Sequence, residues 1–133
     1  KNPKIIISGF NPHSGENGLI GKEEEKYLIP TIKKLKKIMI NISGPYSADT
    51  IFNKHNIKKY DCFICIYHDQ ALIPFKLISK FSGVNFTGLL DIVRTSPDHG
   101  PAYDLVKKEN ASDKSLINAF ILADKINKNR ISK

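Results

Sequence analysis

Polar segments that directly follow predicted strands contain three of the four histidines: His13, His68 and His99. In a parallel sheet such segments lie at one edge, so these imidazoles can converge although they are far apart in the sequence. Imidazole is a common ligand of divalent transition metals, and carboxylates nearby can bind the ion or orient the rings. The carboxylates in the same segments are Asp49, Asp69 and Asp98. A single loop histidine is more often a surface or capping residue, so the joint placement carries the prediction of a metal site.

A second set of polar residues near strand ends comprises Lys76, Asn85 and Arg94. Two cations and an amide are suited to holding a phosphate or carboxylate through charge-assisted hydrogen bonds. Lys76 could equally be one of many surface lysines. Arg94 is one of only two arginines and follows an apolar run, and Asn85 interrupts a strand pattern where asparagine is disfavoured. The set therefore predicts an anion-binding site.

These side chains must be positioned by alternating strands and helices. Short β-branched or apolar runs predict strands at 4–8, 40–42, 61–67 and 84–90, with 61–67 as the central strand and 95–101 as a loop. Apolar residues at helical spacing predict a helix over 22–39 that is interrupted at Pro30, with Met39 on its apolar face. Further helices are predicted to start at Ser47, at Pro74, at Ala102 and at Ser112, and 53–59 is predicted to be a polar connector.

The last predicted helix is expected to bury Leu116, Phe120 and Ala123, with Ile117 and Ile121 alongside. Strands that alternate with helices indicate an α/β fold with a mostly parallel sheet flanked by helices in three layers. The 133 residues fit a single domain. Because the first residue is Lys1 rather than Met, we expect the chain to be a piece of a longer protein.

The formal charge of +8 comes mostly from lysine. These lysines are not interleaved with stacking aromatics, so a solvated basic surface is favoured over a nucleic-acid interface. No apolar run approaches the length of a membrane span and no leader pattern opens the chain, which predicts a soluble, cytoplasmic protein without a membrane partner. The sequence also lacks the G-x-S-x-G nucleophile motif, the dinucleotide-binding glycine motif and a second cysteine pair that could complete a zinc site with Cys62 and Cys65.

Several motifs, in order and in register, closely resemble the C-terminal part of the 4-hydroxythreonine-4-phosphate dehydrogenase family. They are Asn11-Pro12-His13-Ser14-Gly15-Glu16, Gly44-Pro45 with Ala48-Asp49-Thr50, Tyr67-His68-Asp69-Gln70, Gly83-Val84-Asn85 and Arg94-Thr95-Ser96-Pro97-Asp98-His99-Gly100. The resemblance covers essentially the whole chain but somewhat under half of a full family member. It implies an isocitrate/isopropylmalate dehydrogenase-like fold, of which this chain is the C-terminal part only.

The resemblance implies an enzyme of pyridoxal 5′-phosphate (vitamin B6) biosynthesis. Such an enzyme oxidises 4-phosphooxy-L-threonine with NAD and a divalent metal (zinc, magnesium or cobalt), then releases CO2 to give 3-amino-2-oxopropyl phosphate. It also implies a homodimer whose active site is shared between subunits. The fragment alone is expected to be inactive.

The resemblance also implies residue roles. His13 and His68 match two of the family's three metal ligands, and the third is expected in a preceding N-terminal part. Lys76, Asn85 and Arg94 match substrate-binding positions. Asp49 and Asp69 match acidic positions beside the metal and are the candidates for a catalytic role, while the proton-transfer group stays unidentified. The His99-Gly100 loop matches the adenosine side of the cofactor site. Where many relatives read Gly-Leu-Pro, this chain has Leu89-Leu90-Asp91, which puts a carboxylate near Arg94.

Two alternatives remain open at this point. A paralogue could oxidise another phosphorylated hydroxy acid, such as 4-phospho-erythronate. A non-catalytic module that binds anions or metal is the alternative from another class, and it would account for the missing third ligand.

Overall fold

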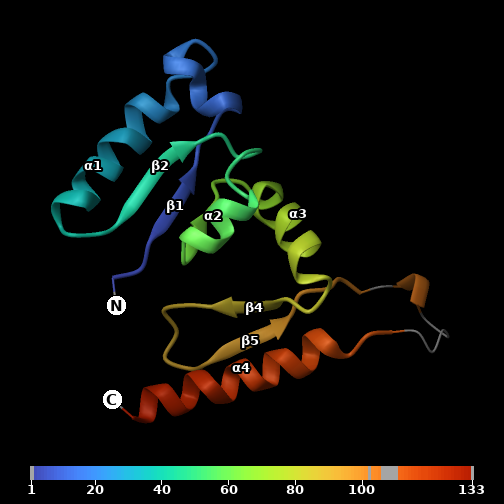
Figure 1. Cartoon of the computed structure of the whole chain (residues 1–133). Helices are drawn as coiled ribbons and strands as arrows, with labels where there is room; N and C mark the ends of the chain where they lie inside the picture. The colour runs from blue at the N-terminus through green and yellow to red at the C-terminus, as the bar shows by residue number, and fades with distance from the viewer. Residues whose placement is uncertain (1, 102, 106–110, 133) are drawn as a thin grey trace. The chain divides into compact units, whose positions relative to one another are not determined.

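The computed structural model describes residues 2–101, 103–105 and 111–132 (Figure 1). The chain divides into two compact units, Lys1–Pro74 and Phe75–Lys133. Each unit is described by itself, and the expectation of a single domain over residues 1–133 stays a prediction. Within the described residues, no helix is both long and apolar enough to cross a membrane.

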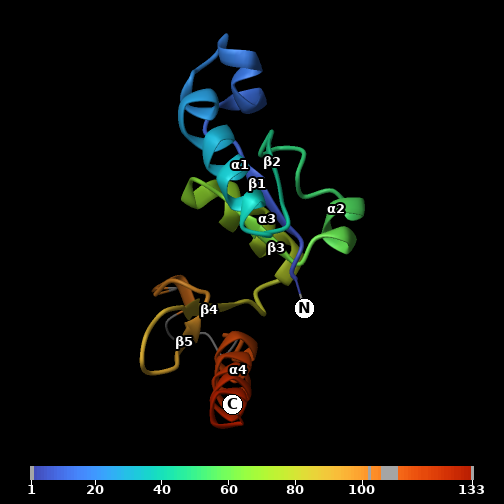
Figure 2. The ribbon, with the colours of Figure 1, turned by 90° about the vertical axis from the view of Figure 1, so that its left-hand side faces the viewer.

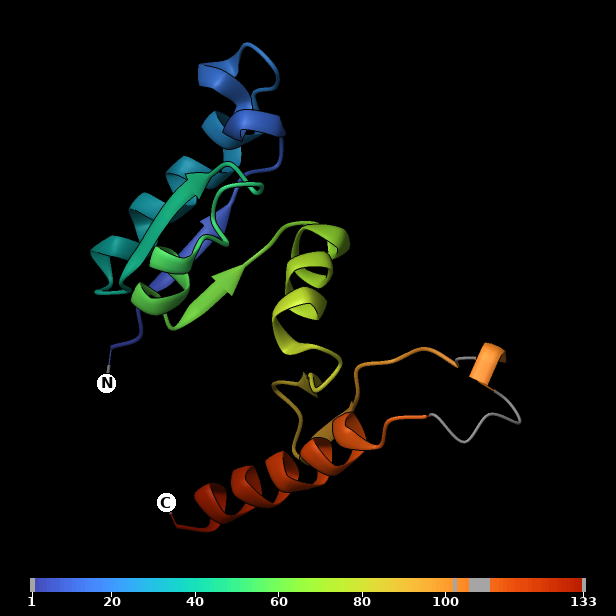
Figure 3. The ribbon, with the colours of Figure 1, turned by 45° about the vertical axis from the view of Figure 1, so that its right-hand side comes forward.

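The first unit is built on three parallel strands, β1 (Ile5–Ser8), β2 (Ile42–Tyr46) and β3 (Cys62–Ile64), in the order β2-β1-β3 (Figure 3). β1 is therefore the middle strand, as its continuous β-branched sequence indicates. The prediction that 61–67 is the central strand was wrong, because β3 is shorter and lies beside β1 on the far side from β2. Cys62 on β3 is exposed.

Helices lie on both faces of this sheet, with α1 (Ile29–Lys37) and α2 (Lys54–Lys59) on opposite sides (Figure 2). The crossovers from β1 to β2 and from β2 to β3 run in opposite directions, and right-handed connections then put their helices on opposite faces. A mostly parallel sheet flanked by helices is the fold that the alternation predicted.

The helical segment before β2 starts with a π-helical turn, η2 (Glu24–Leu28), and continues as α1. Leu28 and Ile32 on this segment pack with Ile7 and Ile42 of the sheet to form the core. Pro30 occupies the first turn of α1, where its missing N–H is not needed, so the predicted interruption is a change of helix type. Met39 lies beyond the helix and is exposed, contrary to the prediction.

Three boundaries differ from those predicted for the segment after α1. β2 continues through Ser43, Gly44 and a cis Gly44-Pro45 bond to Tyr46. A turn rather than a helix occupies residues 47–50. The helix comes instead at α2, where a polar connector was predicted, because the Asn53 side chain caps it by accepting a hydrogen bond from the Asn56 backbone N–H at 2.9 Å.

α3 (His68–Ser79) begins six residues before the start predicted at Pro74. Pro74 is tolerated inside this helix, so the proline does not mark a first turn. As a consequence His68 and Asp69 stand in the first turn of a helix rather than in a loop.

The second unit contains β4 (Val84–Thr87) and β5 (Arg94–Pro97), which form an antiparallel pair, the short η3 (Tyr103–Leu105) and α4 (Lys114–Ile131). The loop predicted at 95–101 was therefore wrong for its first three residues. Of the helix predicted from Ala102 to Lys108, only residues 103–105 are described, and they form a single 3-10 turn.

The buried face of α4 was also predicted wrongly, since Ser115 and Ala119 are buried while Leu116 and Phe120 are exposed. Small residues allow the helix to approach the hairpin closely. The Thr95 hydroxyl on β5 donates a hydrogen bond of 2.9 Å to the backbone carbonyl of Ala119. Of the apolar residues expected on the buried side, Leu116, Ile117, Phe120 and Ile121 are exposed, whereas Ala123 is half-buried.

Candidate active site

A pocket of about 370 Å3 lies where β1 and β2 end and α3 begins. It is lined by Phe10, Asn11, Pro12, His13, Ala48, Asp49 and Gln70. His13 follows β1, Asp49 follows β2 and Gln70 lies in the first turn of α3, so the structure brings together groups from three separate segments. Of the three histidines predicted to converge, His13 lines this pocket, together with Asp49, whereas His68 and His99 do not. His68 is two residues before Gln70 on α3.

The segment that holds His13 is a left-handed turn, η1 (Pro12–Gly18), with positive φ at every residue from His13 to Gly18. Non-glycine residues disfavour this region by about 1 kcal/mol each, so contacts from outside the turn must hold it. The side chain that does so is Glu24 of η2, which is only 2% exposed. A Cβ on Gly15 would lie 2.7 Å from Glu24 Oε2, so only glycine leaves room for this carboxylate.

The ionised form of Glu24 is favoured although the side chain is buried. Burial raises the pKa of this carboxyl, but hydrogen bonds from the Asn11 backbone N–H and side-chain amide lower it by more, and the net pKa lies below its ordinary value. The two bonds measure 2.7 Å to the backbone nitrogen and 2.8 Å to Nδ2. An anion is therefore built into the base of the turn that carries His13.

His68 is oriented by its neighbour. Its Nδ1 lies 2.7 Å from Oδ1 of Asp69, and both side chains are largely exposed, at 75% and 80%. A carboxylate on one ring nitrogen favours the proton there and directs the other nitrogen, Nε2, toward a ligand. His13 has a looser contact of the same kind, with Nδ1 3.8 Å from Oε1 of Glu16.

The donor types of His13, His68 and Asp49 suit a divalent transition metal, but they supply only part of a coordination shell. Among the residues that the structure describes, no three histidine, cysteine, aspartate or glutamate side chains gather closely enough to hold an ion. Structural and catalytic zinc sites use at least three protein ligands. The assignment of His13 and His68 as metal ligands therefore stays a prediction.

The second unit contains the three residues predicted to bind an anion. Lys76 Nζ lies 3.8 Å from Oδ2 of Asp98 and 3.5 Å from its backbone carbonyl oxygen. Asp98 Oδ2 is buried and makes no hydrogen bond within the described residues. The ammonium is thus held beside the end of β5, immediately before His99.

Asn85 and Arg94 are on one face of the hairpin. In the register of β4 and β5, Asn85 pairs with Ser96 and Thr87 pairs with Arg94, so all four side chains alternate to the same side. The Arg94 guanidinium donates a 2.8 Å hydrogen bond to the Thr87 hydroxyl, which agrees with this placement. Thr95 points the other way, toward α4. Asn85 and Arg94 therefore occupy the face that α4 does not cover.

The carboxylate near Arg94 does not pair with it, since within the described part of the chain no ion pair joins Asp91 to that arginine. The backbone carbonyl of Asp91 instead accepts a bond from Arg130. Arg94 is exposed although it follows an apolar run in the sequence. His99 and Gly100 are exposed, and His99 Nδ1 lies 3.2 Å from the Gly100 carbonyl oxygen.

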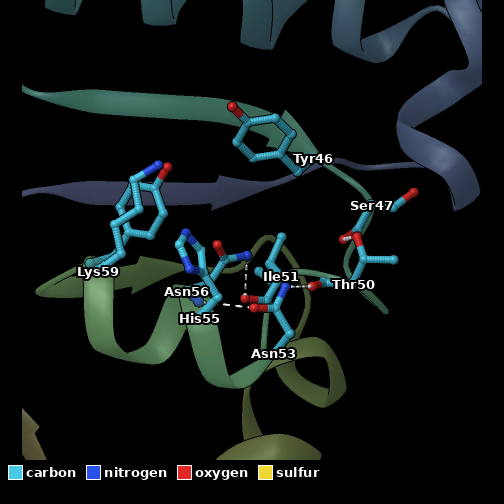
Figure 4. A pocket seen from close by; sticks show the side chains of 9 residues that line it. Tyr46, Ser47, Thr50, Ile51, Asn53, His55, Asn56 and Lys59 are labelled. Carbon is cyan, nitrogen blue, oxygen red and sulfur yellow. Dashed lines mark hydrogen bonds between the residues drawn. The ribbon is translucent and has the colours of Figure 1, made fainter.

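A second pocket, of about 390 Å3, lies beside α2 and contains none of the predicted site residues (Figure 4). It is lined by Tyr46, Ser47, Thr50, Ile51, Asn53, His55, Asn56, Lys59 and Tyr60. The pKa of Tyr60 is lowered, chiefly by a hydrogen bond with the Ser43 hydroxyl and further by Lys59. His55, the one histidine that was not predicted at a strand end, is in this pocket.

Sequence reasoning missed Glu24, Gln70 and Ser115. Glu24 sits one turn before the buried Leu28, which is an unusual place for a carboxylate and a usable signal. Gln70 belongs to the His-Asp-Gln motif, but no function was predicted for its side chain. Ser115 opens α4 on the buried side, and nothing in its local pattern distinguishes it from a cap.

Comparison with known proteins assigns the family. The family model described as "Pyridoxal phosphate biosynthetic protein PdxA" matches residues 1–123. The chain belongs to the PdxA family. A relative from Zymomonas mobilis named 4-hydroxythreonine-4-phosphate dehydrogenase is 46% identical over 121 residues, covering 91% of this chain and 36% of its own length. One from Bradyrhizobium diazoefficiens with the same name is 45% identical over 124 residues, covering 93% and 36%.

Solved structures of PdxA proteins agree with this assignment. The 4-hydroxythreonine-4-phosphate dehydrogenase from Klebsiella pneumoniae has a TM-score of 0.76 and 38% identity, over 92% of this chain and 37% of that one. A terephthalate 1,2-cis-dihydrodiol dehydrogenase from Burkholderia xenovorans is more distant, with a TM-score of 0.61 and 26% identity over 92% and 38%. The chain thus spans little more than a third of the PdxA relatives it matches.

Proposed function

We propose that this chain is part of a dehydrogenase that oxidises 4-phosphooxy-L-threonine with NAD and a divalent metal in pyridoxal 5′-phosphate biosynthesis. Bound NAD would supply the hydride acceptor for the first step, in which the substrate hydroxyl would lose its proton and become a ketone. In the second the carboxylate leaves as CO2 and a proton takes its place, giving 3-amino-2-oxopropyl phosphate. The observation that carries the proposal is the pocket in which His13 and Asp49 converge beside the start of α3.

The first unit would hold the metal through His13 and His68, together with a third ligand from outside this chain. A bound divalent cation would supply Lewis acidity toward the substrate oxygen. Asp69 would keep the His68 ring oriented through its 2.7 Å contact with Nδ1. Asp49 lines the same pocket as His13 and is the carboxylate placed to hold or move a proton there.

The second unit would bind the substrate anions. Arg94 and Asn85 share the uncovered face of the hairpin, which suits recognition of a phosphate or carboxylate by a planar guanidinium and an amide. Lys76 would contribute a further positive charge, and Asp98 limits where its ammonium can lie. The exposed His99 and Gly100 are proposed to contact the adenosine side of NAD.

We also propose a cytoplasmic homodimer in which the active site is completed across the subunit boundary. Two features support it: the described residues supply fewer than three metal ligands, and the outer face of α4 exposes large apolar side chains. These are Leu116, Ile117, Phe120 and Ile121.

The decisive experiment measures NADH formation by the full-length protein with 4-phosphooxy-L-threonine, before and after chelation of metal. We expect turnover that chelation abolishes and added zinc, magnesium or cobalt restores. His13→Ala and His68→Ala should each lower kcat/KM by at least 100-fold, whereas His55→Ala in the second pocket should not. Full activity of both site variants would overturn the proposal.

The second candidate is a paralogue with another substrate, and the Burkholderia xenovorans neighbour is a related structure whose name gives a different substrate. A paralogue acting on another phosphorylated hydroxy acid, such as 4-phospho-erythronate, would use the same hairpin face. Parallel measurement of kcat/KM for the two phosphorylated substrates distinguishes them, and a preference for the sugar acid would replace our assignment.

The isolated chain is expected to be inactive. Tight stoichiometric zinc binding by it alone would favour a non-catalytic metal-binding module.

A further inference from the structure

The side-chain amide of Gln70 makes four hydrogen bonds, and they join the ends of two neighbouring strands. Its Oε1 accepts from the Ser8 hydroxyl at 2.9 Å, from Ile66 N–H at 3.0 Å and from Tyr67 N–H at 3.2 Å. Its Nε2 donates to the Gly9 carbonyl oxygen at 3.1 Å. Ser8 is fully buried, so the amide is anchored to the interior of the sheet.

The two chain segments that bond to this amide each lead to a histidine. Ser8 ends β1, and Gly9 starts the segment that reaches His13. Ile66 and Tyr67 precede His68, the first residue of α3. Gln70 thus connects the two histidine-bearing segments by hydrogen bonds, and it lines the pocket with His13 and Asp49.

Only a glutamine at this position satisfies all four groups. A glutamate could accept the three bonds but would place a second oxygen against the Gly9 carbonyl, where no proton is available. A methionine of similar length can neither accept nor donate usefully. Three donors already occupy Oε1 and one Nε2 hydrogen is bound to Gly9, so only the second Nε2 hydrogen is left for another partner. This geometry favours a structural link over direct ligand contact.

We propose that Gln70 is a positioning residue that sets the relative placement of the His13 and His68 imidazoles, and through them the affinity for metal. This inference rests on the proposed function, since it requires those histidines to be ligands. Partners of this kind, one step removed from the metal, typically change its affinity by 10–100-fold.

The test titrates the full-length, metal-free protein with Co2+, followed by calorimetry and by the visible absorption of the bound ion. Gln70→Met should weaken Co2+ binding by 10–100-fold and shift the absorption band. Gln70→Glu, which keeps the acceptor, should fall between wild type and Gln70→Met. Ser8→Ala removes one of the four hydrogen bonds and should weaken Co2+ binding by less than Gln70→Met does. It replaces Gln70→Met in the test if that variant does not fold.

The matched control is Ile32→Val, a change in the hydrophobic core that lowers thermal stability without touching the Gln70 amide. Ile32→Val should lose about as much thermal stability as Gln70→Met, yet its Co2+ affinity and absorption spectrum should be unchanged. If Ile32→Val weakens binding as much as Gln70→Met, Gln70 acts only through general stability and the proposal is wrong.

His13→Ala and His68→Ala separate this inference from the proposed function. If neither variant loses Co2+ affinity, the metal assignment itself fails. If both lose it while Gln70→Met and Ser8→Ala retain wild-type affinity and spectrum, the assignment stands and the positioning role of Gln70 is overturned.

Discussion

The carboxylate of Glu24 accepts two hydrogen bonds from Asn11, 2.7 Å from the backbone nitrogen and 2.8 Å from the side-chain amide. Asn11 caps the left-handed turn that carries His13, while Glu24 starts the helical segment packed on the sheet. The pair therefore ties a disfavoured backbone conformation to the helical segment whose Leu28 and Ile32 pack in the core.

Replacing Glu24 by glutamine should destabilise the full-length protein by roughly 1–3 kcal/mol. The new glutamine side chain would direct one of its own N–H groups toward an N–H donor of Asn11, so one of the two hydrogen bonds would be lost. Urea unfolding followed by circular dichroism measures the change. Glu25→Gln, one residue along and exposed, is the control and should change stability by less than about 0.5 kcal/mol. Equal effects of the two variants would show that the buried carboxylate is not what holds the turn.

The Glu24 pair should also make stability depend on pH. The folded-state pKa of Glu24 lies below the ordinary value of 4.5, so its stabilisation is complete above that pH and is lost as the pH falls through the lower folded pKa. Glu24→Gln lacks this contribution. The difference in unfolding free energy between wild type and variant should thus shrink below pH 4.5. A difference that stays constant from pH 7 to pH 3 would contradict the assignment.

Ser115 should be essential to the second unit. Its buried hydroxyl donates to the Gly83 carbonyl at 2.5 Å and accepts from Asp98 N–H at 2.8 Å, so it joins both ends of the hairpin to α4. Ser115→Ala leaves two buried backbone groups without partners and should cost about 2–4 kcal/mol. Thermal unfolding detects the loss, and Ser132→Ala at the exposed end of the helix should have almost no effect.

The two arginines provide a matched pair for substrate recognition. Arg94→Lys should raise KM for the phosphorylated substrate about tenfold, because an ammonium cannot reproduce the planar, two-pronged contact of a guanidinium. Arg130 donates only to the backbone carbonyls of Leu90 and Asp91, so Arg130→Lys should leave KM near the wild-type value. Steady-state kinetics of the full-length enzyme make the comparison. An unchanged KM in Arg94→Lys would remove this residue from the substrate site.

Much of the first unit was predictable because its signals are local. A β-branched run without polar residues identifies a strand buried on both faces, and Ile5–Ser8 is the middle strand of the sheet. The rule that parallel strands end at one edge then brings His13 and Asp49 together, as the pocket shows. The errors cluster where a side chain overrides the pattern. Asn53 starts a helix in a lysine-rich connector, and Gln70 holds the two residues before His68 so that α3 begins there.

By itself the sequence determined the α/β class, the segments that carry the candidate ligands and the membership of the PdxA family, since periodicity and motif spacing are properties of neighbouring residues. Only the tertiary structure decided which face of α4 is buried, which strand pairs with β4, and that Glu24 and Gln70 hold the histidine-bearing segments. Those outcomes depend on partners up to 62 positions away, such as Asn11 for Glu24 and Ser8 for Gln70. Local periodicity indicates that a residue is buried, whereas its hydrogen-bond partner depends on how the whole chain folds.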